Sequence, residues 1–221
     1  MSRVVVLRPE PGASETAARA RQLGLEPIRV PLFEVEPIAW EAPNPAGFDA
    51  LLLTSANAIR YAGERLSGLR TLPVHAVGEA TAQTARDAGF DVASVGEARV
   101  DTLLDSLDPP LRLLHLCGED RREPQAARQT ITSLVVYRSK DRAHVDVSGA
   151  QGAIVLIHSP RAGRRFAELS GERGSTSIAA ISANAADAAG DGWGRVEIAE
   201  QPNDHALLAL AARLCNKPPP Q

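Results

Sequence analysis

Two short polar turns carry the residue types best suited to binding an acidic ligand. Each follows an apolar run and precedes a stretch with helical spacing: Thr54-Ser55-Ala56-Asn57 and His158-Ser159-Pro160-Arg161. Ser55 and Ser159 are predicted N-caps, and Pro160 suits the first helical position because its missing N–H costs nothing there. Backbone N–H groups at helix starts favour anions by about 0.3–1 kcal/mol each. Ordinary helix capping is the alternative interpretation of either turn.

A second pair of turns has the same placement in the sequence. Gly78-Glu79-Ala80-Thr81 and Ser182-Ala183-Asn184-Ala185 also follow apolar runs. In open parallel sheets, ligands bind outside the carboxyl ends of the strands, where all four turns are expected. Four turns in register favour a binding function over capping alone.

Tyr137 is the side chain best suited to proton donation. It is one of two tyrosines, and it lies in a β-rich segment beside Arg138. A neutral phenol can donate a proton or a hydrogen bond at neutral pH. Packing within a strand is the alternative for Tyr137, whereas Tyr61 falls in a predicted helix and is interpreted as a packing residue.

Other kinds of chemistry have little support in the sequence. The five histidines show no spacing that pairs them with each other or with a cysteine, so we interpret them as structural. Cys117 and Cys215 lack partners at metal-ligand spacing. Walker-type loops, Gly-x-Gly-x-x-Gly after the first strand and Cys-x-x-Cys are all missing. We therefore expect no cofactor, no metal and no nucleotide.

The composition is that of a folded protein without a strong overall charge. The chain has 221 residues, 44% of them hydrophobic and 23% charged, with a formal net charge of −3. Such a charge attracts neither nucleic acid nor an anionic membrane. Apolar runs stay short of the ~20 residues of a membrane helix, and the first residues show no export signal. We expect a cytoplasmic monomer whose partner is a small molecule.

Strand and helix patterns alternate along the chain, which indicates parallel sheets with crossover helices. The apolar runs expected as strands are Val4–Leu7, Leu51–Leu53, Val74–Val77, Leu113–Leu114, Ile154–Ile157 and Ile178–Ile181. The stretches expected as helices are Thr16–Leu23, Ala58–Leu66, Thr81–Ala88, Ala162–Leu169 and His205–Leu214.

The sequence also repeats itself. Segment 46–107 maps onto 150–211 without a gap, so that Ser55 falls on Ser159 and Leu52 on Leu156. The fold class expected is α/β, with two similar parallel-sheet domains.

Two β-rich segments lie where the chain would pass between these domains. They are Val30–Val35 and Leu134–Arg138, and we expect linker strands over 33–37 and 135–140 that pair with each other. One domain is then discontinuous, and the other lies between the linkers. The expected bounds are 1–32 with 141–215 for domain 1, 38–134 for domain 2 and 216–221 for a flexible tail. Segment 108–140 is expected to hold a strand at 111–116 and a short helix. Two crossings predict a hinge with a ligand cleft between the domains.

Several short motifs occur in an order and spacing that resemble the uroporphyrinogen-III synthase family, over nearly the whole chain. The motifs are Leu7-Arg8-Pro9, Gly24, Pro31, Leu53-Thr54-Ser55-Ala56-Asn57-Ala58, Ala76-Val77-Gly78-Glu79-Ala80-Thr81-Ala82, Cys117-Gly118, Val136-Tyr137, Ser159-Pro160 and Ala199-Glu200-Gln201-Pro202.

The resemblance implies two α/β lobes joined by a two-stranded ladder, and a lyase that needs no cofactor. The implied substrate is the linear tetrapyrrole hydroxymethylbilane. It would lose water, form a spiro intermediate and close with ring D inverted to give uroporphyrinogen III. Because this substrate closes unaided to the uninverted isomer, the protein must mainly hold one conformation.

The resemblance also implies roles for individual residues. Tyr137 matches the tyrosine proposed to assist departure of the hydroxyl group, and Ser55 and Ser159 match serines that face the substrate. The remaining residues expected to bind substrate lie at the same strand ends: Arg8, Thr54, Asn57, Gly78, Thr81, Gly118, Arg161 and Ser182.

Two other function classes stay open. A catalytically weak tetrapyrrole-binding or regulatory protein with this fold would bind the same ligand without turnover, and it is favoured by departures from the family pattern at His158 and Ser182. A two-lobed solute-binding protein is disfavoured, because no export signal is visible.

Overall fold

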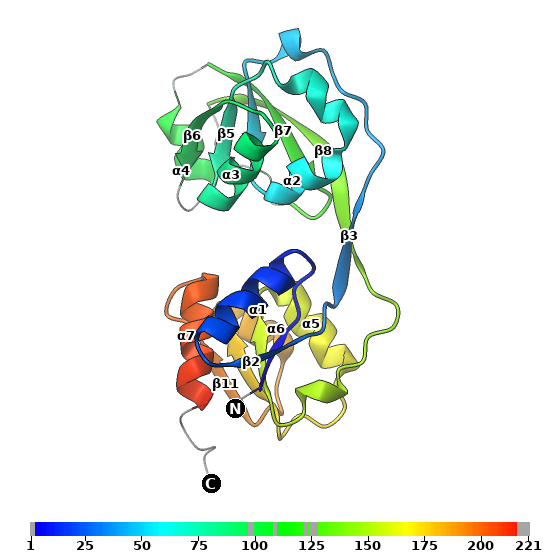
Figure 1. The fold of residues 1–221 in the computed structure, drawn as a ribbon, viewed down its shortest axis with the longest axis vertical. Coiled ribbons are helices and arrows are strands. Elements are labelled where there is room, and N and C mark those ends of the chain that lie inside the picture. Colours follow the sequence, from blue (N-terminus) through cyan, green and yellow to red (C-terminus); the bar gives the residue numbers. More distant parts are fainter. Residues whose placement is uncertain (1–2, 97–99, 108–109, 122, 124–127, 216–221) are drawn as a thin grey trace. The chain divides into compact units, whose positions relative to one another are not determined.

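The computed structural model describes residues 3–96, 100–107, 110–121, 123 and 128–215. The chain divides into two compact units. Unit 1 comprises Met1–Glu34 and Lys140–Gln221, and unit 2 comprises Val35–Ser139. In Figure 1 unit 1 is coloured dark blue and yellow to red, whereas unit 2 is coloured mainly cyan and green. The cleft expected between the domains stays a prediction.

Unit 1 is built on a five-stranded parallel sheet with the strand order β11-β10-β9-β1-β2. Its central strands read as unbroken apolar runs because both faces of the sheet are covered. The strands are β1 (Arg3–Val6), β2 (Glu26–Arg29), β9 (Ile154–Ile157), β10 (Ser177–Ala180) and β11 (Arg195–Ile198).

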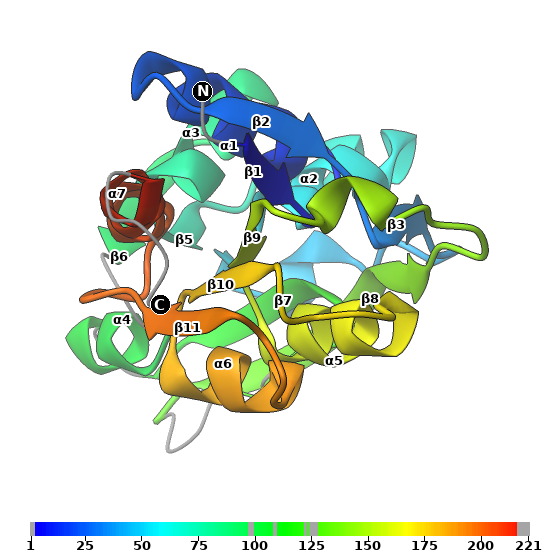
Figure 2. The same ribbon diagram turned by 90° about the horizontal axis from the view of Figure 1, so that it is seen from below.

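Helices pack on both faces of this sheet, as Figure 2 shows. Val4 and Val6 point to the face covered by α1 and α7, while Val5 and Leu7 point to the face covered by α5 and α6. The alternation follows from the period of two along a strand. The helices are α1 (Gly12–Gln22), α5 (Pro160–Leu169), α6 (Ala183–Ala189) and α7 (Asp204–Cys215), with a short 3₁₀ helix η3 (Ser148–Ala150).

Unit 2 is built on a six-stranded sheet with the order β3-β8-β7-β4-β5-β6, in which the pairs from β8 to β6 are parallel. Helices α2 and α3 cover the face of Leu51 and Leu53, and α4 covers the face of Leu52. The elements are β3 (Phe33–Pro37), η1 (Pro45–Gly47), β4 (Ala50–Leu53), α2 (Ala56–Ala62), η2 (Glu64–Leu69), β5 (Val74–Val77), α3 (Glu79–Asp87), β6 (Val92–Gly96), α4 (Val100–Ser106), β7 (Arg112–Gly118) and β8 (Thr130–Asp141).

The internal repeat predicted from the sequence appears in the order of the elements. Strand β4 and helices α2, α3 and α4 begin at residues 50, 56, 79 and 100, and β9, α5, α6 and α7 begin at 154, 160, 183 and 204. Strands β5 and β6 correspond to β10 and β11 with a shift of one residue. The strand that pairs with the first strand of each repeat comes from a different part of the chain in the two units. In unit 1 it is β1, which precedes the repeat and pairs with β9, whereas in unit 2 it is β7, which follows the repeat and pairs with β4.

The expected α/β class is confirmed, but several element boundaries differ from expectation. Helix α1 begins at Gly12 rather than at Thr16, and two other differences have a clear physical reason. The strand expected over 30–35 is interrupted, because β2 ends at Arg29 and β3 begins at Phe33; the backbone between them stays bonded to unit 1, with Leu32 N donating to Leu7 O at 3.0 Å. The helix expected over 58–66 ends at Ala62, where Gly63 takes a φ of 71° that favours glycine.

Strands β3 and β8 are neighbours in the sheet of unit 2. Ile38 N donates to Val136 O at 3.0 Å, and Arg138 pairs with Glu36 at 2.6 Å. The strand expected over 134–138 is the middle of the twelve-residue β8. The short helix expected between β7 and β8 falls largely on residues outside the described part of the chain.

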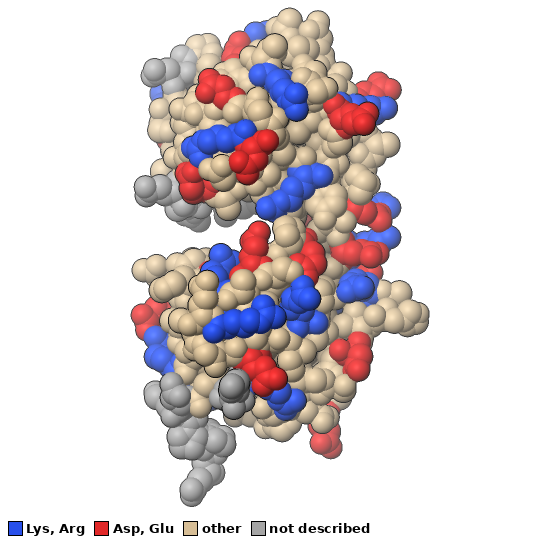
Figure 3. Space-filling model, viewed as in Figure 1, with Lys and Arg blue, Asp and Glu red and all other residues tan. Residues whose placement is uncertain are grey.

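Charged side chains of both signs are interspersed over the face shown in Figure 3, in keeping with the small net charge of −3. Within the described residues, no helix is long and apolar enough to cross a membrane.

Candidate functional site

A pocket of about 300 Å³ lies in unit 2 at the carboxyl ends of its strands. It brings together four residues predicted from the sequence, because Thr54 and Ser55 follow β4, Gly118 ends β7 and Tyr137 lies on β8. The other lining residues are Val77, Val100, Asp120 and Arg121.

The phenol of Tyr137 rests on the backbone of Gly118. A register shift between Cys117 and Gly118 pairs Gly118 with Tyr137 across β7 and β8. A Cβ atom at residue 118 would lie 2.7 Å from Cζ of Tyr137 and 2.9 Å from its hydroxyl oxygen. Glycine is therefore required for the observed ring position, which places the hydroxyl at the pocket. The ring of Tyr61 lies 6.2 Å away, centroid to centroid, consistent with a packing role.

The Tyr137 hydroxyl is a proton donor at neutral pH. Burial raises the pKa of Tyr137 above its usual value of 10, and a hydrogen bond with Ser55 only partly opposes this shift. The group therefore stays protonated under physiological conditions and can donate to a ligand oxygen.

Arg121 supplies positive charge to the pocket and was missed in the sequence. Its Nη2 lies 2.5 Å from Oε1 of Glu123, and its buried Nε has no hydrogen-bond partner among the described residues. An arginine fork suits carboxylates. Its position in the sequence could have indicated it, because Asp120 and Arg121 directly follow the end of β7, just as the four predicted turns follow other strands.

Thr54 is joined to the interior of the sheet through His115. Oγ1 of Thr54 lies 3.1 Å from Nε2 of His115, and Nδ1 of His115 lies 3.4 Å from Oγ of Ser133. Burial, with a contribution from the nearby charge of Arg121, lowers the pKa of His115 to about 4. The imidazole is therefore neutral at pH 7.

Three further predicted residues of unit 2 lie near these strand ends but do not line the pocket. Asn57 donates its backbone N–H to Oγ of Ser55 at 3.2 Å, which confirms Ser55 as the N-cap of α2. Gly78 precedes α3 with a φ of 82°, and Thr81 is buried, with its N–H donating to Gly78 O at 3.1 Å.

The predicted residues of unit 1 are engaged in local contacts. Ser159 and Ser182 cap α5 and α6, accepting from the backbone N–H of Ala162 at 3.2 Å and Ala185 at 3.4 Å. Arg161 donates to Asp141 at 2.7 Å and stacks over the ring of Phe33. Arg8 donates to Oγ1 of Thr16 at 3.2 Å, and its Nη1 lies 3.7 Å from Oδ1 of Asp204.

Unit 1 holds charged side chains where unit 2 has its pocket. The repeat places His158 at the position of Thr54 and Asp204 at the position of Val100. Nε2 of His158 lies 2.8 Å from Oδ1 of Asp204. Burial alone would raise the pKa of Asp204, but hydrogen bonds from His158 and Thr16 and the charge of Arg19 hold it at about 2.

Two further observations bear on other kinds of site. A cavity of about 290 Å³ in unit 1 lies by η3 and the end of α5, at the amino ends of the strands, and includes no predicted site residue. Among the described residues, no cluster of three or more His, Cys, Asp or Glu side chains could hold a metal ion.

Comparison with known proteins identifies the family. The family model described as uroporphyrinogen-III synthase HemD matches residues 14–209, which include most of both units. The chain belongs to the uroporphyrinogen-III synthase family. The resemblance drawn from the short motifs is thereby confirmed.

Individual members of the uroporphyrinogen-III synthase family are similar to this chain. A uroporphyrinogen-III synthase from Chlorobaculum parvum is 28% identical over 119 residues, 49% of this chain and 48% of that protein. The chain thus spans about half the length of this curated relative in the match.

Two solved structures share the fold of this family member. The uroporphyrinogen-III synthetase of Helicobacter pylori aligns with a TM-score of 0.69 at 21% identity, covering 97% of this chain and 100% of that one. A mutant uroporphyrinogen III synthase of Thermus thermophilus aligns with a TM-score of 0.53 at 17% identity, covering 98% and 100%.

Proposed function

We propose that this protein is a uroporphyrinogen-III synthase, which dehydrates hydroxymethylbilane and closes it to uroporphyrinogen III with ring D inverted. Family membership supports the reaction. The observation that carries the site is the pocket of unit 2, where the Tyr137 hydroxyl lies against the backbone of Gly118 beside Arg121.

Tyr137 assists the loss of water in this proposal. Its protonated hydroxyl donates a hydrogen bond to the departing hydroxyl group of the substrate, which makes that group a better leaving group. Because the pKa of Tyr137 is raised by burial, the donor form persists through the neutral pH range. The hydrogen bond with Ser55 orients the phenol.

Arg121 binds a substrate carboxylate. The substrate carries acetate and propionate groups, and a hydrogen bond to a charged partner contributes about 1.5–3 kcal/mol. Glu123 holds one side of the guanidinium at 2.5 Å, which limits the directions from which a carboxylate can approach.

The size of the pocket suits one end of the substrate. A volume of about 300 Å³ is at the lower limit for small-molecule sites and holds one substituted pyrrole ring rather than four. Fixing one ring beside Tyr137 restricts the conformation in which the chain of rings closes. Such orientation is the main source of catalysis when the substrate also reacts unaided.

The test is the isomer composition of the product. Hydroxymethylbilane is presented to the purified protein, and the ratio of uroporphyrinogen III to uroporphyrinogen I is measured against a protein-free control. We expect isomer III to predominate. An unchanged isomer ratio would overturn the proposal, and tight binding of uroporphyrinogen III without turnover would instead support the binding-protein alternative.

A further inference from the structure

A row of hydrogen-bonded side chains crosses the sheet of unit 2, starting at the pocket. Thr54 follows β4, His115 lies in β7 and Ser133 lies in β8, which are three adjacent strands. The register pairs His115 with Leu52 on one side and with Ser133 on the other. The row ends at Glu123, whose Oε2 lies 3.3 Å from Oγ of Ser133.

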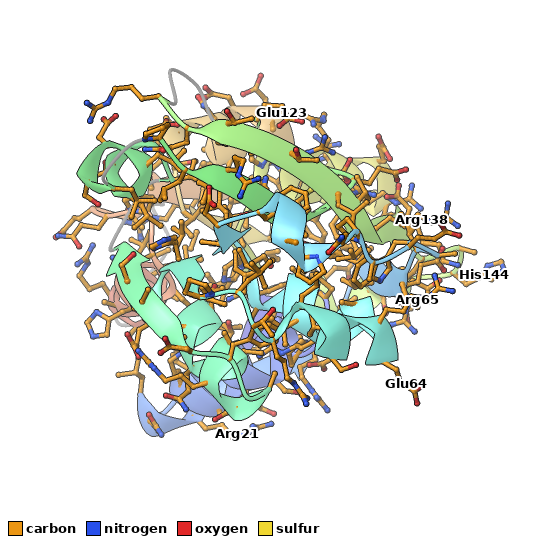
Figure 4. The ribbon with its side chains drawn as sticks, turned by 90° about the horizontal axis from the view of Figure 1, so that it is seen from above. Arg21, Glu64, Arg65, Glu123, Arg138 and His144 are labelled. Carbon is orange, nitrogen blue, oxygen red and sulfur yellow. The ribbon has the colours of Figure 1, made fainter. Side chains whose placement is uncertain are left out.

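Glu123 fixes the direction of the hydrogen bonds. Its carboxylate pairs with Arg121, and because a carboxylate has no hydrogen to donate, it can only accept. Figure 4 shows Glu123 beside strand β8. The hydroxyl of Ser133 therefore donates its single hydrogen to Glu123, and its oxygen accepts from His115. The proton of the imidazole then belongs on Nδ1.

The direction continues through His115 to the pocket. His115 is 1% exposed, and its lowered pKa keeps the ring neutral at pH 7. A neutral imidazole has one donor and one acceptor nitrogen, so Nε2 accepts when Nδ1 carries the proton. Thr54 thus donates its hydrogen to His115, and its oxygen presents only lone pairs to the pocket.

We propose that His115 is a positioning residue, which holds the Thr54 hydroxyl as the hydrogen-bond acceptor for a pyrrole N–H of the substrate. The proposal rests on the function proposed above and adds to it the orientation of the bound ring. Pyrrole nitrogens are donors, whereas the acetate and propionate substituents end in carboxylates, which only accept. Thr54 therefore faces the nitrogen edge of the ring, while Arg121 and Tyr137 face groups that accept.

The direction of the hydrogen bonds can be measured without any reaction. The protein is labelled with ¹⁵N-histidine, and the nitrogen shifts of His115 are assigned by their loss in His115→Gln. At pH 7 we expect a neutral ring with the proton on Nδ1. A proton on Nε2, or a charged ring, would overturn the proposal whatever the enzyme activity.

The coupling between His115 and Thr54 is tested by a double-mutant cycle. The variants are Thr54→Val, which keeps the shape but loses the hydroxyl, His115→Leu, and the two combined. KM for hydroxymethylbilane is expected to rise about tenfold in each single variant and no further in the double variant. Multiplied effects in the double variant would show that His115 does not act through Thr54.

His75→Leu is the matched control. His75 is also buried in this sheet, but its Nδ1 lies 2.7 Å from Oγ of Ser94 on β6, away from Thr54. Its loss should reduce thermal stability without raising KM. Equal increases of KM for His75→Leu and His115→Leu would reduce His115 to a packing residue.

Two conservative variants keep the test decisive if His115→Leu does not fold. Thr54→Ser retains the hydroxyl, and His115→Gln places an amide near the position of Nε2, so both should keep KM within about threefold of wild type. If the wild-type protein shows no turnover, the function proposed above fails, and the same cycle is run on Kd for uroporphyrinogen III under anaerobic conditions. Additive changes in that affinity would overturn the role of His115.

Discussion

Replacing Gly118 with alanine should slow the proposed reaction by moving the Tyr137 ring. The added Cβ would lie 2.7 Å from Cζ, 2.8 Å from Cε2 and 2.9 Å from the hydroxyl oxygen. Nonbonded carbons rest at about 3.5–4.0 Å, so the ring must retreat by roughly 0.8 Å or more. A misplacement near 1 Å can cost about 10²-fold in rate, and overpacking costs about 1–3 kcal/mol of stability.

We therefore expect kcat to fall about 10- to 100-fold in Gly118→Ala, equivalent to roughly 1.4–2.8 kcal/mol of activation free energy. The assay measures formation of uroporphyrinogen III, and urea unfolding reports stability separately. Gly68→Ala is the control, because nothing lies within 4 Å of a Cβ there. In Tyr137→Phe, the further loss caused by Gly118→Ala should be smaller than in wild type. A Gly118→Ala variant with normal kcat would refute the placement of Tyr137 on Gly118.

Three other substitutions give separate tests. Tyr137→Phe should lower kcat with little change in unfolding free energy, whereas Tyr61→Phe should leave kcat unchanged, as measured by product formation. Ser55→Ala should lower the free energy of unfolding by about 1 kcal/mol through loss of the α2 cap, and it should also weaken affinity for uroporphyrinogen III. Asn203→Ala is its control, because it removes a comparable contact to the N–H of Ala206 at 2.8 Å and should change stability alone. The carboxylate of Asp204 has its pKa lowered to about 2 in the folded state, so its stabilisation is present above about pH 4 and is lost as the pH falls toward 2. Between pH 7 and pH 3, urea unfolding should show a loss of about 1 kcal/mol from this carboxylate in wild type, and the loss should be smaller by this amount in Asp204→Asn.

Much of the fold could be predicted because local patterns and tertiary structure agree. The run Ile154–Ile157 is apolar on both faces, which is typical of a central parallel strand, and it forms β9. The turn at Ser55 carries the chemistry of an N-cap, and the side chain accepts from Asn57 N. These features depend on a few neighbouring residues, so a sequence displays them directly.

The missed parts of the site depend on strand register. His115 lies among apolar neighbours in β7, and that pattern indicates only a core position. Its partners Thr54 and Ser133 come from other strands, and their alignment is set by how β4, β7 and β8 pair. Arg121 and Glu123 lie in a segment without periodicity. Side chains that meet only across a sheet leave no signature in a single sequence.

The end of α2 could not be predicted from the spacing of apolar residues. Apolar spacing continues from Ala58 to Leu66, and Leu66 is indeed buried. Helix α2 nevertheless ends at Ala62, because the positive φ of Gly63 interrupts the helical backbone hydrogen bonds before η2 begins. The apolar spacing is therefore reflected in the burial of Leu66 but does not mark the helix boundary.

The contrast between Val100 and Asp204 has a consequence for exchanging parts of the two copies. A chimera that replaced α4 with α7 at the same register would keep the strand order and the crossover. It would nevertheless bring a carboxyl group to the pocket lined by Arg121, and the reverse graft would leave Nε2 of His158 without the hydrogen bond to Asp204. The helices and strands of the two copies correspond in position, but the side chains at the carboxyl ends of their strands cannot be exchanged.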